Sequence, residues 1–74
     1  MKQSLKTGDP VIWRWANGYA HGTIVSIDTG RTEITRHGKN IARDGTADDP
    51  AVTIMDHNNT KVLKLASELQ GKGD

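Results

Sequence analysis

The aromatic side chains are the residues of this chain best suited to binding a ligand, and they lie close together in the sequence. Trp13, Trp15 and Tyr19 all fall within the stretch WRWANGY, and the 74 residues include no phenylalanine. Grouped rings can contact a ligand, or they can supply the bulk of a small hydrophobic core. Because Trp15 stands next to a predicted turn, it is the first candidate for an exposed binding contact.

Other residues that could do chemistry do not form a recognisable catalytic or metal-binding pattern. The histidines have no metal-ligand spacing, and there is no cysteine to complete a site. They are His21, His37 and His57. Asp48-Asp49 precedes Pro50 and fits a loop that leads into a strand, while Gly45-Thr46 lacks the lysine of a phosphate-binding loop. We therefore expect no enzyme, no metal site and no cofactor.

Size and composition predict one small soluble domain. A chain of this length buries only about 60% of the surface that its unfolded form exposes, so every large apolar residue matters for stability. The absence of cysteine fits a reducing cytoplasm, and the polar first residues do not resemble a signal peptide. We expect a cytoplasmic monomer that does not associate with membranes.

Net charge is only +1, but the basic residues are distributed unevenly along the chain. Residues 31–43 carry four of them with Glu33 as their one acidic neighbour, and residues 44–49 are acidic. The basic residues are Arg31, Arg36, Lys39 and Arg43. A solvated strand beside an acidic loop explains this pattern, and a phosphate-binding strand is the functional alternative.

Short runs rich in Val, Ile and Thr, separated by Gly, Asn and Pro, predict about five antiparallel strands. The expected strands cover residues 11–16, 20–28, 31–36, 51–55 and 60–65. Residues 39–49 are expected to form a long polar connection, anchored only by Ile41. Ser67 is expected to cap a short C-terminal helical turn, and residues 71–74 to fray. The fold class is thus an all-β small barrel or sandwich, with a flexible segment 1–7, a domain over 8–70 and a tail over 71–74.

The Asn17-Gly18 pair predicts a two-residue hairpin turn, which sets the register of the first two strands. On that register Trp15 faces Ala20 and Trp13 faces Gly22, and alternation places both indoles on one apolar face. Tyr19 lies on the opposite face. We therefore expect Trp13 in the core, and the three rings not to form one cage.

Several short segments of the sequence resemble the corresponding segments of SH3-like barrels of the Tudor kind. They are Gly8-Asp-Pro-Val-Ile-Trp13, Asn17-Gly18 and His21-Gly-Thr-Ile-Val25. Together with residues 42–51 and 62–69, the chain resembles a small bacterial family of hypervirulence-associated proteins with a Tudor-like domain. That family has no established activity, so the resemblance implies a fold, an SH3-like or Tudor-like barrel, and no chemistry.

Tudor domains that read methylated arginine or lysine surround the cation with about four aromatic side chains. On their pattern the cage positions fall at Trp13 and near Ala20, Met55 and Asn58, so three of the four are not aromatic. The resemblance therefore argues against a methylated ligand.

The leading hypothesis is a non-catalytic module that binds a protein or peptide. The predicted contacts are Trp15, Tyr19, Met55 and Arg14. The alternative is nucleic-acid binding through Arg31, Arg36, Lys39 and Arg43. A third reading is an accessory domain whose edge strand, residues 31–36, pairs with another chain.

Overall fold

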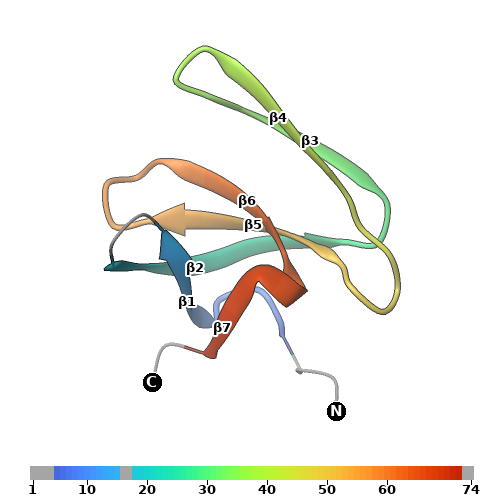
Figure 1. Cartoon of the computed structure of the whole chain (residues 1–74), viewed down its shortest axis with the longest axis horizontal. Helices are drawn as coiled ribbons and strands as arrows, with labels where there is room; N and C mark the ends of the chain where they lie inside the picture. Colours follow the sequence, from blue (N-terminus) through green and yellow to red (C-terminus); the bar gives the residue numbers. More distant parts are fainter. Residues whose placement is uncertain (1–4, 16–17, 73–74) are drawn as a thin grey trace.

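A computed structural model of the chain describes residues 5–15 and 18–72, without the side chains of Trp15 and of residues 70–72. Within these residues the fold is all-β, as predicted, with two antiparallel sheets and a single 3₁₀ turn (Figure 1). The elements are β1 (Pro10–Trp15), β2 (Gly18–Asp28), β3 (Arg31–Arg36), β4 (Lys39–Asp44), β5 (Ala51–Asp56), β6 (Lys61–Leu65), η1 (Ala66–Glu68) and β7 (Leu69–Lys72). Five strands form one sheet in the order β6-β5-β2-β1-β7, and β3 and β4 form the other.

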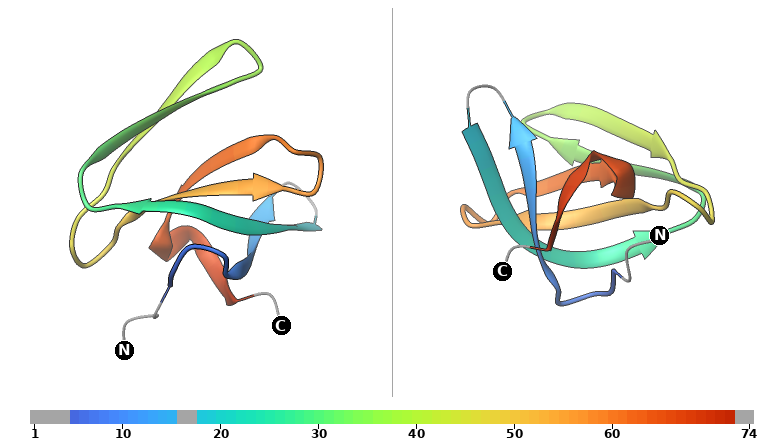
Figure 2. Two further views of the ribbon diagram at one scale, coloured as in Figure 1. Left: turned by 180° about the vertical axis from the view of Figure 1, so that it is seen from behind. Right: turned by 60° about the horizontal axis from the view of Figure 1, so that its bottom comes forward.

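The long strand β2 bends the five-stranded sheet over on itself. Its first half pairs with β1 and its second half pairs with β5, and the register shifts between Ile24 and Ser26. Such an irregularity increases the local bend and twist of a strand. As a result β1 and β7 cross over β5 and β6 instead of continuing in one plane (Figure 2).

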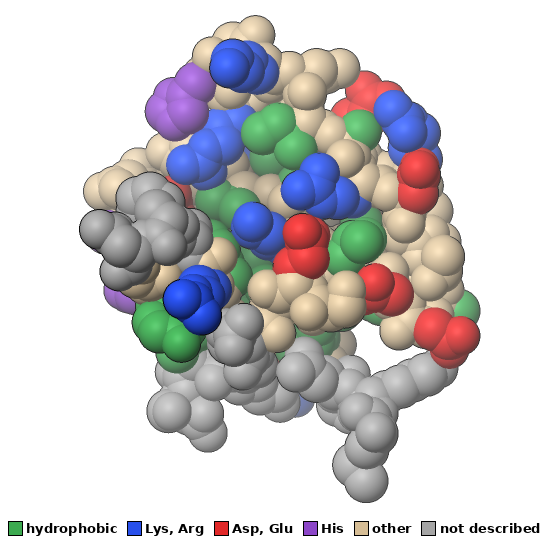
Figure 3. Space-filling model, in the orientation of Figure 1, with side chains coloured by type: hydrophobic (Ala, Val, Ile, Leu, Met, Phe, Trp, Pro, Cys, Tyr) green, Lys and Arg blue, Asp and Glu red, His purple; other side chains and the backbone are tan. Residues whose placement is uncertain are grey.

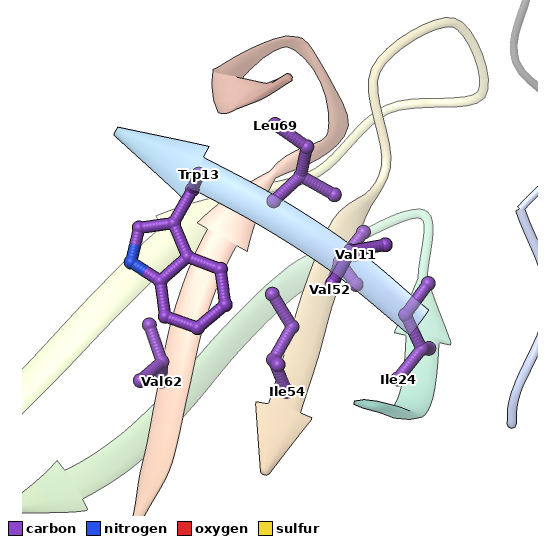
Figure 4. Close-up of a cluster of buried hydrophobic side chains, with 7 residues drawn as sticks. All are labelled: Val11, Trp13, Ile24, Val52, Ile54, Val62 and Leu69. Carbon is purple, nitrogen blue, oxygen red and sulfur yellow. The ribbon is translucent and has the colours of Figure 1, made fainter. Parts of the chain in front are cut away.

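The hydrophobic core fills the space inside this bend. Seven buried side chains come from five strands and pack together (Figure 4). They are Val11, Trp13, Ile24, Val52, Ile54, Val62 and Leu69. Each side chain of this size contributes about 1.5–3 kcal/mol when fully buried. Trp13 is 4% exposed, so the prediction that it belongs to the core is confirmed.

The predicted register of the first hairpin is wrong by two residues. Trp13 pairs with Ala20 and Trp15 pairs with Gly18, so Gly18 is the first residue of β2 and not part of the turn. The connecting residues 16 and 17 lie outside the described residues. Because side chains alternate with a period of two, a shift by two leaves every side chain on its predicted face. Trp13 still points inward and Tyr19 outward.

The polar connection predicted for residues 39–49 is also wrong, because its first half is the strand β4. β3 and β4 pair along their full length, with Ile34 opposite Ile41. His37 and Gly38 join them, with φ angles of 53° and 77°. Positive φ at both central residues is typical of the tight turn that matches the twist of a two-stranded ribbon.

The strands do not close into one hydrogen-bonded barrel. No backbone ladder between the described residues joins the β3–β4 hairpin to the larger sheet, although both strands lie against β6. Two side-chain contacts attach the hairpin instead. Arg36 Nη1 donates to the carbonyl oxygen of Lys61 at 3.1 Å, and Arg43 Nε lies 3.3 Å from Glu68 Oε1. The sequence analysis predicted a closed barrel, whereas the structure is an open arrangement of two sheets.

The C-terminal segment contains the expected short helical turn, but Ser67 does not cap it. Leu65 is the N-cap residue, and its backbone N–H donates to Glu68 Oε1 at 2.7 Å. Ser67 instead donates through its N–H and its hydroxyl to the two carboxylate oxygens of Asp49, at 2.7 and 2.8 Å. β7 follows and pairs with β1, a strand that the sequence pattern did not indicate.

Candidate binding face

Tyr19 is the largest exposed apolar side chain among the described residues, at 65% exposure. It is the second residue of β2, pairs with Arg14 of β1, and points away from the core. Two adjacent hollows share its ring together with Ala20, His21 and His57. An exposed ring shared by two concave surfaces is the arrangement expected of a binding contact.

The first hollow, called here the outer hollow, has a volume of about 470 Å³. It lies on the outward side of β1, β2 and the end of β5. Its lining includes Pro10, Ile12, Tyr19, Thr23, Met55 and His57. The structure thus brings together Tyr19 and Met55, two of the residues predicted from the sequence.

The second hollow, called here the basic groove, has a volume of about 480 Å³. It lies between the first part of β2, the strand β6 and the β3–β4 hairpin. Its lining includes Trp13, Tyr19, Arg36, Ile41, Arg43, Val62, Leu63 and Lys64. Buried apolar residues form its floor, and half-buried basic side chains contribute to its lining.

His21 and His57 stack against each other at the junction of the two hollows. Their ring centroids are 5.2 Å apart and the rings are inclined by 15°. His21 pairs with Ile12 across the ladder, not with Arg14 as the predicted register implied. No set of three His, Cys, Asp or Glu side chains among the described residues is grouped closely enough to hold a metal ion. The pair is an addition to the predicted site. Gly22 pairs with Asp56 in the β2–β5 ladder, which brings the two neighbouring histidines together, and no sequence signal indicated this pairing.

The four basic residues predicted as a nucleic-acid surface do not share one face. Arg31 lies on the outer side of the hairpin, where its guanidinium pairs with Asp44 and Glu33, each at 3.2 Å. The hydrogen bonds to Asp44 and to Glu33 raise the pKa of Arg31 above its ordinary value. Arg36 and Arg43 point toward the body of the protein, and Lys39 is exposed where β4 begins.

Lys64 completes the basic groove and was missed by the sequence analysis. It belongs to β6, on the same face as Val62, and no bond of its side chain occurs within the described part of the chain. Arg36, Arg43 and Lys64 come from three different strands. The sequence signal for Lys64 was its position two residues after Val62 in a predicted strand, because residues two apart in a strand share a face.

Asp56, the last residue of β5, organises the turn that follows this strand. Burial by itself raises the pKa of its carboxyl, but the backbone N–H groups of Thr60 and Asn58 and the charge of Arg36 lower that pKa below its ordinary value. Both N–H groups donate to Asp56 Oδ1 at 2.9 Å. The carboxylate therefore fixes the turn from which His57 projects.

The other two predicted contact residues, Arg14 and Trp15, are not among the described lining residues of the two hollows. Arg14 is exposed and pairs with Tyr19 across the β1–β2 ladder, outside the described lining of either hollow. The side chain of Trp15 lies outside the described residues.

A family model described as "Hypervirulence associated proteins TUDOR domain" matches residues 8–69. The chain belongs to this family. No match to a curated protein or to a solved structure was found. Tudor domains are generally binding modules and commonly interact with protein or nucleic acid. The match confirms the family resemblance that the sequence analysis inferred from short segments of the chain.

The candidate site of this Tudor domain differs from an aromatic cage. Trp13 and Tyr19 lie on opposite faces of the first hairpin, and the sequence analysis expected them not to share a site. Both nevertheless line the basic groove. Trp13 is almost wholly buried, so little of its ring is exposed to a ligand. Figure 4 shows its indole nitrogen on the side of the ring away from Ile54 and Leu69. The residues at the other cage positions are Ala20, Met55 and Asn58, which have no π-face to offer.

No helix among the described residues is long and apolar enough to cross a membrane.

Proposed function

We propose that this Tudor domain is a non-catalytic module that binds a segment of another protein at the face around Tyr19. One observation carries the proposal: a tyrosine at 65% exposure is shared by two adjacent hollows in a chain that has only three aromatic residues. Tyrosine is enriched at the centres of protein interfaces because its ring offers a large contact area at a low cost in conformational entropy.

The surroundings of the ring support a peptide as the ligand. The outer hollow adds Met55, a flexible apolar side chain that adapts to different partners. The stacked histidines supply hydrogen-bonding groups beside it. An extended segment that passes over Tyr19 would place successive side chains in the outer hollow and in the basic groove, because side chains of a strand alternate in direction.

Nucleic-acid binding through the basic residues of the β3–β4 hairpin is the alternative. The ion pairs of Arg31 with Glu33 and Asp44 weigh against it, because the phosphate backbone would have to displace them. A polyanion that lies along the hairpin would also meet both carboxylates. Binding of a protein segment around Tyr19 does not require these ion pairs to break.

The test is a titration of the ¹⁵N-labelled chain with pools of synthetic decapeptides, followed by amide chemical shifts. We expect the shifts to cluster at Tyr19, His21 and His57. Tyr19→Ala should weaken binding by about 2 kcal/mol, as for the loss of a central interface tyrosine. Val25→Ala is the matched control, because Val25 is exposed on the same strand but is not among the lining residues of either hollow. Equal effects of the two substitutions, or shifts confined to residues away from β2, would contradict the proposal.

A further inference from the structure

The basic groove combines an apolar floor with a basic rim, and this combination selects one kind of ligand. Trp13, Val62 and Leu63 form part of the floor, each less than a tenth exposed, and Ile41 of the hairpin contributes a half-buried wall. A volume of about 480 Å³ lies within the range of pockets that enclose a small ligand or a side chain and its neighbour. The floor therefore favours an apolar side chain.

The rim carries positive charge that is only partly neutralised. Arg36, Arg43 and Lys64 line the groove, and no Asp or Glu occurs among its described lining residues. Glu68 is paired with Arg43, and the charge of Arg36 acts on Asp56, outside the lining. Lys64 lines the groove and has no acidic partner within the described part of the chain.

This charge rejects a cationic ligand. A methylated lysine or arginine in the groove would lie near three like charges beside a surface of low dielectric constant, where Coulomb repulsion is stronger than in water. A carboxylate in the same place would be attracted, and it could accept hydrogen bonds from Lys64 and the free guanidinium nitrogens.

The surroundings of the groove limit how far the ligand's negative charge can extend. Basic and hydrophobic side chains mix across the middle of the face shown in Figure 3, while acidic side chains lie among and beside them. Two acidic groups lie beside the basic residues of the groove: Glu68 is paired with Arg43, and Asp56 interacts electrostatically with Arg36. Glu33 and Asp44 lie on the outer side of the hairpin, where they pair with Arg31. A long polyanion would meet these carboxylates, whereas one or two acidic side chains of a peptide would not.

We infer that the basic groove binds a peptide segment in which a large apolar side chain is flanked by Asp or Glu, the apolar group on Trp13 and Val62 and a carboxylate on Lys64. This inference rests on the proposed function and adds the chemistry of the partner to it. The complementarity of charge between the groove and the segment is what distinguishes this occupant from other peptides.

The experiment uses the full chain and a defined peptide set. The probes are three blocked hexapeptides with a central leucine flanked on both sides by aspartate, by asparagine or by lysine, together with a thymidine octanucleotide. Binding is measured by amide shifts and by the indole N–H signals at 50 and 500 mM NaCl. We expect the aspartate peptide to bind with shifts at Trp13, Val62 and Leu63, to weaken at high salt, and to exceed the asparagine peptide about tenfold, as for the loss of a charge-assisted hydrogen bond.

Lys64→Gln should reduce the affinity for the aspartate peptide about twofold to fivefold, because a partly exposed ion pair contributes up to about 1 kcal/mol. Lys39→Gln is the matched control, because Lys39 is an exposed lysine outside the groove lining, and it should leave the affinity unchanged. Both variants should keep the amide spectrum of the parent away from the substituted residue, which shows that they fold.

Three results with the peptides would overturn the inference. They are equal binding of the aspartate and asparagine peptides, equal effects of the two lysine substitutions, and absence of binding by the aspartate peptide. Tighter binding of the octanucleotide than of the aspartate peptide would also overturn it, in favour of nucleic acid. If the asparagine peptide binds equally well with shifts around Tyr19, the inference fails while the proposed function stands. If Tyr19→Ala leaves binding of every peptide unchanged, the proposed function itself fails.

Discussion

Gly22 lies at the place where the sheet folds over, and replacing it with alanine should destabilise the domain strongly. Its backbone pairs with Val11 of β1 on one side and with Asp56 of β5 on the other. A Cβ atom added there would lie 2.6 Å from Ile54 Cγ2 and 2.6 Å from the carbonyl oxygen of Met55. Non-bonded carbon atoms prefer about 3.5–4.0 Å, so a strand must move by about 1 Å.

The magnitude follows from the kind of atoms that the new methyl group meets. Two of its three nearest atoms belong to the backbone of β5, which cannot rotate away as a side chain can. Overpacking of a tight core costs about 1–3 kcal/mol, and we place Gly22→Ala at the upper end, about 2–3 kcal/mol. The lower conformational entropy of the unfolded alanine chain offsets less than about 1 kcal/mol of this. In a domain of this size, such a loss is a large fraction of the total stability.

Gly18→Ala is the matched control in the same strand. An added Cβ at Gly18 meets no atom within 4 Å, and its φ angle is not positive. The control should therefore stay within about 0.5 kcal/mol of the parent, or gain stability through the unfolded state. Urea unfolding monitored by far-ultraviolet circular dichroism gives both free energies, provided that the two slopes agree. Equal unfolding midpoints for Gly22→Ala and Gly18→Ala would refute the packing argument.

Three further predictions concern the core and the loops that hold the binding face. In a Trp15→Phe variant, the remaining fluorescence comes from Trp13, which is 4% exposed, so acrylamide should quench it weakly. Asp56→Ala removes the acceptor of two backbone N–H groups and should cost about 1–2 kcal/mol near pH 7. Because the folded-state pKa of Asp56 is lowered, its contribution is present above the ordinary aspartate pKa of about 3.9 and is lost as the pH falls through the lower folded-state pKa. Asp49→Ala removes both acceptors of Ser67 and should cost about 1–2 kcal/mol in thermal or urea unfolding, with Asp49→Asn losing less.

Each of these predictions has an outcome that contradicts it. Quenching of Trp13 as strong as that of free tryptophan would show that the indole is not in the core. A stability loss for Asp56→Ala that does not diminish as the pH is lowered below the ordinary aspartate pKa of about 3.9 would show that the ionised carboxylate is not what holds the turn. An Asp49→Asn variant less stable than Asp49→Ala would mean that the contact to Ser67 does not stabilise the C-terminal turn.

The strands that the sequence predicted well are those set by local signals. Residues 31–36 form β3 with the predicted bounds, and the Asp56 turn follows β5 as expected. Turn residues and β-branched runs act over a few positions, so they are visible without the rest of the fold. The face assignment of Trp13 and Tyr19 survived the error in register because that error was two residues, which is the period of side-chain alternation.

The strand β4 could not be predicted in this way. Its sequence Lys-Asn-Ile-Ala-Arg-Asp carries one strong apolar residue, Ile41, and reads as a polar loop. Its pairing is supported by partners on β3, with Arg31 bonded to Asp44 and Glu33 bonded to Asn40. Such cross-strand pairs stabilise a sheet only after the two strands have come together.

The sequence alone determined that the chain is an all-β domain with Trp13 inside, Tyr19 outside and too few rings for an aromatic cage. These properties follow from composition and from the alternation of side chains along a strand, which are local. Only the tertiary structure decided that Lys64 joins Arg36 and Arg43 at one groove, and that Arg31 is neutralised on the far side of the hairpin. The direction of a side chain is set by its own strand, but its neighbours depend on how distant strands bend and cross.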